Sequence, residues 1–480
     1  LRRLPGGLAG LQHRIVMEGG DLPEGARSLD ELERSGAAWL DRHPEAVDAR
    51  IDSLGPGDLA TLIHTSGTTG PPKGVMLVHD NWMFQAEALA ADLATHLRPG
   101  DKQYLFLPLA HAFGKLCELI AVVAGVPTAL EGDLDILSEG LQHTQPSLVA
   151  AVPRVFEKIH LRIEARAVAA GSGRHQLFTW AVGVGERAAQ RRLAGQPLGR
   201  RLALELAAAD RLVLRRLRSA LGGRIRAFVS GGAPLSPELA RFFYAAGMTI
   251  LEGYGMTETS AGATANRLDD LAFGTVGRPL PGCEVRIGAD GEILIRGRNV
   301  MRGYWGRPEA TAAALEPDGW LHTGDLGHLD DAGRLHITGR IKDLIITAGG
   351  KNIAPQGLEH RLKAACPLLS EVVVVGDGRP CCVALAWIDE EAAAAWAGAH
   401  GLSARTHAEL STQPEVQALI QGYVERLNHR VAPHERLKRI HLVDHPITEV
   451  QALITPSLKV RRAAVVERYA VEIEALYTQR

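Results

Sequence analysis

Short apolar runs alternate along the chain with longer segments whose apolar residues recur at helical spacing. This alternation predicts a layered α/β protein, in which helices cover a sheet. In the first half of the chain, strands are predicted at residues 59–65, 104–109, 148–152 and 225–230. A helix is predicted at residues 81–97, and most of residues 155–221 shows helical spacing. Residues 116–130 are the apolar stretch most like a membrane span. Glu118 and Pro127 interrupt it, so it is predicted to be buried core instead.

The helical segment at 155–221 is rich in alanine, leucine and arginine. Leu214, Leu217 and Leu221 fall on one face, whereas the arginines at 211, 215 and 218 fall on another. A basic amphipathic helix can lie on a membrane surface. The alternative, which we favour, is a solvated face on a helix that packs against the core.

The pattern changes after Gly274. Two pairs of alternating runs flank turn residues, at 284–287 with 292–296 and at 326–329 with 335–338, and they predict β-hairpins. Beyond Arg340, strands at 371–376 and 382–388 alternate again with helices. The expected fold class is therefore α/β, with a large N-terminal domain of layered α/β sheets and a small β subdomain. A small α+β C-terminal domain follows, on the order of 140 residues long.

We expect the large domain to span residues 1–341 and the small domain to span residues 342–480. The chain starts at Leu1 rather than at methionine, so it could be part of a longer protein. We therefore expect the large domain to be truncated at its start.

Composition narrows the class of function. Apolar residues make up 46% and charged residues 22% of the chain, and the net charge is −2. These values are ordinary for a soluble protein and give no global argument for nucleic acid as a partner. The five cysteines show no metal-binding spacing, so reduced thiols in a cytoplasmic protein are expected.

One loop after the first strand concentrates hydroxyl groups, glycines and a lysine. Backbone N–H groups in such a loop can converge on phosphate oxygens, and the side chains add further donors. The spacing differs from that of a phosphate-transferring P-loop, because two prolines follow Gly70 and a β-like run follows Lys73. The candidate nucleotide-binding residues in the loop are Thr65, Ser66, Gly67, Thr68, Thr69, Gly70 and Lys73.

Together with later motifs, this loop resembles the adenylate-forming superfamily of acyl-CoA synthetases, luciferase and peptide-synthetase adenylation domains. The resemblance runs from about Leu59 to the C-terminus and includes "EGYGMTE" at 252–258, "WLHTGD" at 320–325 and "TPSLK" at 455–459. It implies that the loop grips the β- and γ-phosphates of ATP. No single motif is as specific as this ordered series.

The resemblance assigns nucleotide contacts to further residues. It implies that Tyr254 packs on adenine, Thr257 contacts phosphate and Glu258 holds Mg²⁺. It also implies that Asp325 binds the ribose hydroxyls and that Arg340 reaches the ribose or a phosphate. The resemblance further implies that Gly231, Gly232 and Ala233 belong to a loop that forms a wall of the adenine and acyl pockets.

The C-terminal motifs imply that the small domain is mobile. Its movement would bring a lysine and a loop in turn to one site. Lys342 matches the family's hinge, and Gly349, Gly350 and Lys351 match the loop that lines the thiol tunnel. Lys459 matches the catalytic lysine. It follows Leu458, where most of the family has glycine, and this departure resembles the long-chain fatty acyl-CoA synthetases.

The acyl chain has its own candidate residues. His111 and Phe113 lie in a stretch that resembles the entrance of the acyl pocket. A satisfied core histidine is the alternative for His111.

These residues imply ATP-dependent activation of a long-chain fatty acid, with Lys459, Thr257 and Glu258 as the catalytic candidates. CoA then accepts the acyl group, and AMP and pyrophosphate leave. One alternative is a ligase that passes the acyl group to an acyl carrier protein; another is an inactive, truncated nucleotide- or lipid-binding fragment. ATP, CoA, a fatty acid and Mg²⁺ are the expected partners, and a homodimer and a peripheral membrane contact stay open.

Overall fold

The structure, a computed structural model, describes residues 12–17, 22, 25–65, 72–94, 96–133, 136–454 and 460–478. The chain separates into two units, Leu1–Asp58 and Leu59–Arg480. In the first unit, strand β1 (Arg14–Val16) pairs in parallel with β2 (Ala26–Ser28), and helices α1 (Leu29–Leu40) and α2 (Ala46–Asp52) follow. The Ser28 hydroxyl accepts a hydrogen bond from the Glu31 backbone N–H and so caps α1.

The second unit is built around a sheet of seven strands. Its members are β5 (Gln103–Leu105), β6 (Thr128–Leu130), β7 (Leu148–Ala151), β8 (Ala227–Ser230), β9 (Thr249–Tyr254), β10 (Thr264–Ala265) and β11 (Arg278–Pro279). They lie in the order β11-β10-β9-β8-β7-β5-β6. The pairs from β6 to β9 are parallel, whereas β10 and β11 run antiparallel at the other edge.

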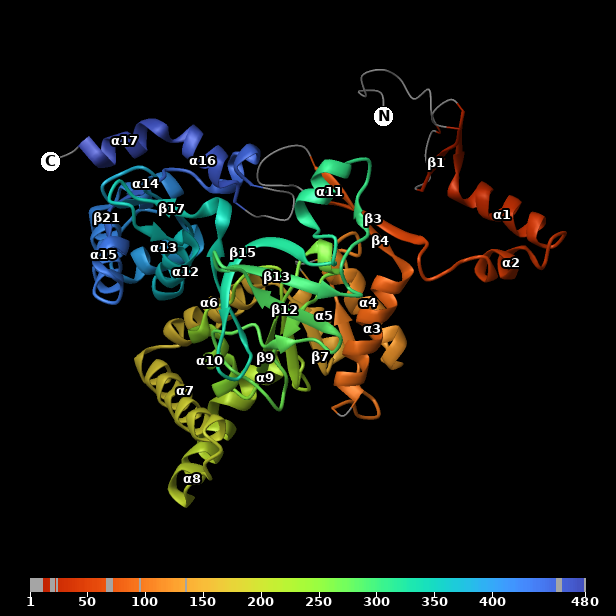
Figure 1. Ribbon diagram of the computed structural model, residues 1–480. Coiled ribbons are helices and arrows are strands. Elements are labelled where there is room, and N and C mark those ends of the chain that lie inside the picture. Colours follow the sequence, from red (N-terminus) through yellow and green to blue (C-terminus); the bar gives the residue numbers. More distant parts are fainter. Residues whose placement is uncertain are drawn as a thin grey trace. The chain divides into compact units, whose positions relative to one another are not determined.

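Parallel strands need long crossover connections, and here helices supply them. They are α4 (Ala112–Ala124), α5 (Leu137–Thr144), α6 (Pro153–Ala169), α7 (Ser172–Leu193), α8 (Arg200–Ala209), α9 (Arg215–Ala220) and α10 (Pro237–Ala245), whereas α3 (His79–Ala94) precedes β5. In the view of Figure 1, α6 and α10 lie to the left of the sheet, and α3 and α4 lie to its right. The layered α/β architecture predicted from the sequence is therefore confirmed.

Three phenylalanines fill the space between the sheet and its helices. Phe156 of α6, Phe228 of β8 and Phe243 of α10 are fully buried. Their rings meet edge to face, with centroids 5.3 to 6.1 Å apart. Edge-to-face pairs add to the stabilisation that burial of the rings already gives.

A β subdomain follows the predicted hairpins. Strands β12 (Cys283–Ile287), β13 (Glu292–Gly297), β15 (Leu321–Leu329) and β16 (Leu335–Arg340) form one antiparallel sheet. A smaller sheet joins β3 (Leu59–Thr65), β4 (Lys73–Val78) and β14 (Gly303–Tyr304). The remaining helix of this part is α11 (Pro308–Ala314).

The C-terminal part has its own sheet of β19 (Leu369–Val375), β20 (Cys382–Ile388) and β21 (Leu437–Leu442). Every residue of β20 is buried, because separate apolar clusters cover the two faces of the sheet. The other elements are β17 (Ile345–Ile346), β18 (Asn352–Ile353), α12 (Pro355–Ala365), α13 (Glu390–Ala399), α14 (His407–Thr412), α15 (Pro414–Asn428), α16 (Arg462–Arg468) and α17 (Ala470–Thr478).

Two sequence predictions need correction. The strand predicted at residues 104–109 ends at Leu105, before Pro108, which has no N–H for the ladder. The segment at 116–130 is only partly core: Leu116 is buried, whereas Val122 on the far face of α4 is 74% exposed.

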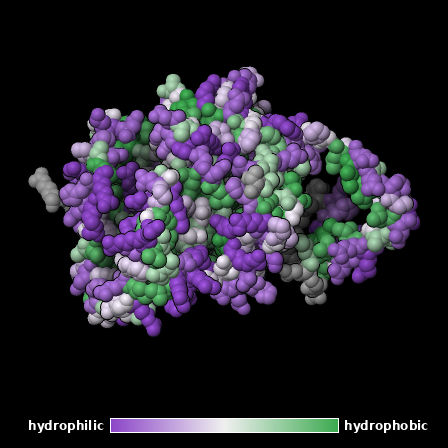
Figure 2. Space-filling view, turned by 90° about the horizontal axis from the view of Figure 1, so that it is seen from below, coloured by the Kyte–Doolittle hydropathy of each residue, from purple (hydrophilic) through white to green (hydrophobic). Residues whose placement is uncertain are grey.

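Among the described residues, no helix is long and apolar enough to span a bilayer. The face in Figure 2 is mainly hydrophilic, with small apolar areas between the polar side chains.

One carboxyl group of the central sheet is almost completely buried. Glu252, near the end of β9, is 7% exposed. Burial raises the pKa of Glu252 to about 8, and a hydrogen bond from the Leu235 backbone opposes this rise. The folded protein therefore holds a proton here that the unfolded chain releases at neutral pH.

Replacing Phe243 with alanine should leave a cavity between α10 and the sheet. We expect the free energy of unfolding to fall by about 3–5 kcal/mol, measured by urea denaturation followed by circular dichroism. Leu204→Ala is the matched control, because Leu204 is 73% exposed. Equal destabilisation by the two changes would contradict this account of the core.

The buried Glu252 predicts a pH-dependent stability. Between about pH 4.5 and 8 the folded state binds more protons than the unfolded state, so the wild type loses stability as the pH rises. Relative to Glu252→Gln, we expect a loss of roughly 4 kcal/mol between pH 5 and pH 8, measured by denaturation at each pH. Glu238→Gln, at an exposed carboxylate, should show no such trend. Parallel pH profiles for the wild type and Glu252→Gln would contradict the prediction.

Candidate active site

The aspartate that the sequence assigns to ribose binding lies at the centre of a buried network. Asp325 of β15 is 5% exposed. Its Oδ2 accepts a hydrogen bond of 2.7 Å from the Tyr254 hydroxyl, and its Oδ1 accepts one of 2.5 Å from Nε of Arg340. Three predicted site residues, separated by up to 86 positions in the chain, are thus in direct contact.

Strand pairing explains why these residues meet. Asp325 lies directly opposite Arg340 in the antiparallel pair of β15 and β16. Tyr254 ends β9, at the carboxyl end of the parallel strands, where sheets of this kind commonly bind ligands. Burial, together with the negative charge of Asp325, raises the pKa of Tyr254 well above its usual value, so the phenol stays a donor.

A second buried contact fixes the predicted magnesium carboxylate. Glu258 lies in a short 3-10 turn, Thr257–Thr259, whose first residue is the candidate Thr257. The Tyr304 hydroxyl donates a hydrogen bond of 2.8 Å to Oε1 of Glu258. The Nζ atom of Lys73 lies 4.7 Å from the centroid of the same Tyr304 ring, within range of a cation–π interaction.

The register of the small sheet brings Lys73 to this place. Tyr304 of β14 pairs with Val75 of β4, two residues after Lys73. Lys73 in turn pairs with Thr65 at the end of β3. The element after the loop is therefore a strand, as predicted, and the arrangement differs from the helix that follows a P-loop. The candidates Ser66, Gly67, Thr68, Thr69 and Gly70 lie outside the described residues.

The acyl-pocket candidates come together in part. A Cβ atom on Gly231 would lie 3.3 Å from the Phe113 ring, so the glycine lets the ring approach the backbone. Gly232 has a φ of +82° and Ala233 is exposed. His111 is the exposed N-cap residue of α4, and its ring has no hydrogen bond among the described residues. The alternative of a satisfied core histidine is therefore wrong.

The C-terminal candidates that the structure describes are exposed turn residues. Lys342 is exposed in the 3-10 turn Ile341–Asp343. Gly349, Gly350 and Lys351 form an exposed turn, in which the Gly350 N–H donates to the Thr347 carbonyl. In the described part of the chain, no hydrogen bond or ion pair joins this turn to the network.

Lys459 lies outside the described residues, but the structure describes the backbone on both sides of its segment. Ile454 and Val460 form an antiparallel bridge. The Arg461 N–H also donates a hydrogen bond of 2.7 Å to the Leu453 carbonyl. The two ends of the segment that carries Lys459 are therefore held side by side.

The described residues suit Mg²⁺ only if the phosphates of a bound nucleotide supply some of its ligands. The described residues contain no group of three or more histidines, cysteines, aspartates or glutamates that could hold a metal ion. Mg²⁺ commonly binds proteins through one or two carboxylates and takes its other ligands from phosphates and water. Glu258 matches this chemistry, because Tyr304 occupies only Oε1 and no described residue bonds to Oε2.

Sequence reasoning missed Tyr304. It lies in "GYWG" at 303–306, between the two hairpins, where an aromatic residue next to glycine reads as an ordinary turn. Its contacts with Glu258 and Lys73 depend on strand pairing between segments more than 200 residues apart. A tyrosine next to glycine was the only signal in the sequence.

Comparison with known proteins agrees with this geometry. The family described as AMP-binding enzyme matches residues 9–305, and its C-terminal domain matches residues 342–480. FadD15 of Mycobacterium tuberculosis, named as a long-chain-fatty-acid–CoA ligase, is 42% identical over 95% of this chain and 75% of its own length. The peroxisomal long chain acyl-CoA synthetase 6 of Arabidopsis thaliana is 32% identical over 88% of this chain and 61% of its own length.

Solved structures show the same fold. ATP-bound MatB from Rhodopseudomonas palustris matches with a TM-score of 0.58 and 26% identity, covering 86% of this chain and 69% of that one. The family match covers more than half of the chain, and the 42% identity to FadD15 extends over 95% of this chain. The chain therefore belongs to the AMP-binding enzyme family.

Proposed function

We propose that this protein is an AMP-forming ligase that activates a long-chain fatty acid with ATP and transfers the acyl group to CoA. The observation that carries the proposal is the Tyr254–Asp325–Arg340 network, with Glu258, four residues after Tyr254, held by Tyr304. The similarity to proteins named long-chain-fatty-acid–CoA ligase supports the substrate class.

In this proposal the chain first binds and orients ATP. The Asp325 carboxylate accepts hydrogen bonds from the ribose hydroxyls, and Arg340 stays beside it as a donor to ribose or phosphate. Tyr254 packs against adenine and Thr257 contacts a phosphate. The hydroxyl and backbone donors at 65–70, together with Lys73, hold the β- and γ-phosphates that leave as pyrophosphate.

The fatty acid carboxylate then attacks the α-phosphorus. Lys459 stabilises the charge on the oxygen that bridges the carboxyl carbon and the phosphorus, because a lysine is a compact cation. Mg²⁺, when held by Glu258 and the phosphates, reduces the negative charge that the attacking carboxylate meets. The product is a mixed anhydride of the fatty acid and AMP, whose acyl carbon is neutral and has a good leaving group.

CoA attacks that acyl carbon in the second half-reaction and expels AMP. We propose that residues 342–480 form a separate small domain that turns about Lys342 between the two half-reactions. Lys459 and the Gly349–Gly350 turn would then occupy one site in succession. The separate sheet of the C-terminal part supports this division. The exposure of Lys342 and of the 349–351 turn also supports it.

The proposal also names the molecule that accepts the acyl group, the residues of the acyl pocket, and the contacts of the protein with a second copy or a membrane. Ligases that use a carrier protein have an insertion in the C-terminal part, and residues 340–351 show none, which favours CoA. His111, Phe113 and Gly231 would line the entrance for the acyl chain. A homodimer and a peripheral contact with a membrane remain compatible with these residues.

The test is palmitate-dependent exchange of labelled pyrophosphate into ATP. The wild type should catalyse exchange, and Lys459→Ala should lose it while still forming acyl-CoA from supplied palmitoyl-AMP. Measuring AMP release with CoA and with a carrier protein identifies the acceptor. Arg461→Ala is the control for a general loss of positive charge in this segment.

Two results would contradict the proposal. The absence of exchange in folded wild-type protein would favour the inactive nucleotide- or lipid-binding alternative. An equal loss of both half-reactions in Lys459→Ala would contradict the separate role of this lysine.

The contact between Tyr304 and Glu258 predicts a metal-dependent binding defect. Tyr304→Phe removes one hydrogen bond to a charged group and keeps the ring beside Lys73. We expect ATP to bind about tenfold more weakly in the presence of Mg²⁺ and with unchanged affinity in its absence, measured by calorimetry.

Tyr104→Phe is the matched control for this change. The Tyr104 hydroxyl is also buried, but it has no hydrogen-bond partner among the described residues. If Tyr304→Phe weakened ATP binding equally with and without Mg²⁺, the tyrosine would not act through the magnesium carboxylate.

A further inference from the structure

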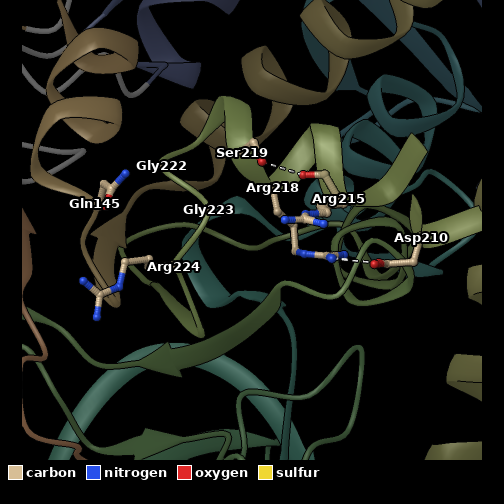
Figure 3. Close-up of a pocket in the computed structure, with 8 residues that line it drawn as sticks. All are labelled: Gln145, Asp210, Arg215, Arg218, Ser219, Gly222, Gly223 and Arg224. Carbon is tan, nitrogen blue, oxygen red and sulfur yellow. Dashed lines mark hydrogen bonds and ion pairs between the residues drawn. The ribbon is translucent and has the colours of Figure 1, made fainter. Parts of the chain in front are cut away.

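A cavity of about 560 Å³ lies in a part of the fold that none of the motifs includes. The turn after α5 and the segment from the end of α8 to the start of β8 surround it. Figure 3 shows Arg224 and Gln145 on one side and Arg215, Arg218 and Asp210 on the other. Ser219, Gly222 and Gly223 complete the lining.

The three arginines of this cavity differ in their partners. Arg218 is held in place, because it donates 2.7 Å to Oδ1 of Asp210 and 2.9 Å to the Ala246 carbonyl. The guanidinium groups of Arg215 and Arg224 have no hydrogen bond or ion pair with any residue that the structure describes. One acidic and three basic side chains therefore line the cavity, and two of the basic groups are free to bind a ligand.

The segment that carries these arginines is strongly basic. Residues 153–226 contain sixteen arginines and lysines but only five aspartates and glutamates, although the whole chain has 53 basic and 55 acidic residues. The segment that carries the cavity arginines therefore has a local excess of positive charge. A local excess of this size attracts anions and raises their concentration near the surface.

An irregular turn of helix positions Arg215 and Arg218 at the cavity. A π-helical turn, Asp210–Leu214, interrupts the helix between α8 and α9. Such turns are rare, and they occur often at functional sites. This one begins at Asp210, the partner of Arg218, and is followed directly by Arg215. The turn also buries Leu214 in a small apolar cluster, which anchors it.

The ordinary explanation for these arginines is stabilisation of a helix end. Basic side chains in the last turn of a helix interact favourably with its dipole. Arg218 fits this explanation. Arg224 does not, because it lies after the end of α9, in the loop that leads to β8. The α9 carbonyls are also already bonded, since Arg218 O accepts from Leu221 and Gly223 and Ser219 O accepts from Gly222.

We propose that this cavity is a second anion site, which binds a phosphate-bearing ligand through Arg215, Arg218 and Arg224. A phosphate group offers several oxygens to guanidinium groups that approach from different sides, whereas a carboxylate fits a single fork. The volume exceeds that of one phosphate ion and suits a diphosphate or the phosphorylated headgroup of a lipid. Both sources share the chemistry that these arginines recognise.

The test uses two probes on the full chain, with the nucleotide site and its β- and γ-phosphate subsite both filled by one equivalent of the non-hydrolysable analogue α,β-methylene-ATP. Inorganic pyrophosphate is titrated by calorimetry, and vesicles of phosphatidylglycerol are compared with vesicles of phosphatidylcholine by co-sedimentation. In Arg215→Ala/Arg224→Ala we expect at least tenfold weaker binding of one probe, with palmitate-dependent exchange unchanged. Binding in the wild type should weaken as salt is added.

The matched control is Arg211→Ala/Arg216→Ala, which removes two exposed arginines of the same segment outside the cavity. Loss of pyrophosphate binding in the cavity variant alone assigns a soluble phosphate ligand, and loss of phosphatidylglycerol binding alone assigns a lipid headgroup. Equal losses of binding in the cavity variant and the control overturn the proposal. They would show that binding depends on the net positive charge of the segment and not on the position of the arginines in the cavity. Failure of the wild type to bind either probe also overturns it. Unchanged thermal unfolding midpoints in both variants exclude a folding defect.

Discussion

The architecture of the site depends on one buried carboxylate. Asp325 is surrounded by protein, and a buried charge is tolerated only when hydrogen bonds and an opposite charge compensate it. Tyr254 and Arg340 supply both, from β9 and β16. The contact thereby ties the central parallel sheet to the β subdomain and fixes the end of the last strand before the proposed hinge at Lys342.

Tyr304 extends this arrangement toward the residues proposed to hold the triphosphate. Its hydroxyl orients Glu258, and its ring faces the ammonium group of Lys73. One side chain therefore contacts both a carboxylate suited to Mg²⁺ and the lysine proposed to hold phosphate. Because Tyr304 lies in a short strand paired with β4, its place beside Lys73 is set by strand pairing.

The sequence was enough to predict the elements whose signal is local. The hairpins at β12–β13 and β15–β16 have an alternating pattern and turn residues, and the helices from α6 to α9 have a helical period. The strand at 104–109 was predicted too long, because burial of Phe106 and Leu107 gives the same apolar pattern as strand pairing. The contact of Asp325 with Arg340 depends on the register in which β15 pairs with β16. The contacts of Tyr304 depend on pairing with β4, a strand from a distant part of the chain. Neither contact can be predicted from a local sequence pattern.

The segment that carries Lys459 is anchored by a second compensated charge. Arg462, at the start of α16, donates 2.6 Å to Oε1 of Glu359 and 2.7 Å to the Val374 carbonyl. Burial raises the pKa of Glu359, and Arg462 opposes this rise. The same Glu359 oxygen accepts the Val374 N–H, so α12, β19 and α16 meet at one carboxylate. A buried ion pair of this kind adds little net stability, but breaking it is costly, so its main effect is to fix position. The backbone that follows the Lys459 segment is therefore fixed to the C-terminal core by the same carboxylate that joins α12 to β19.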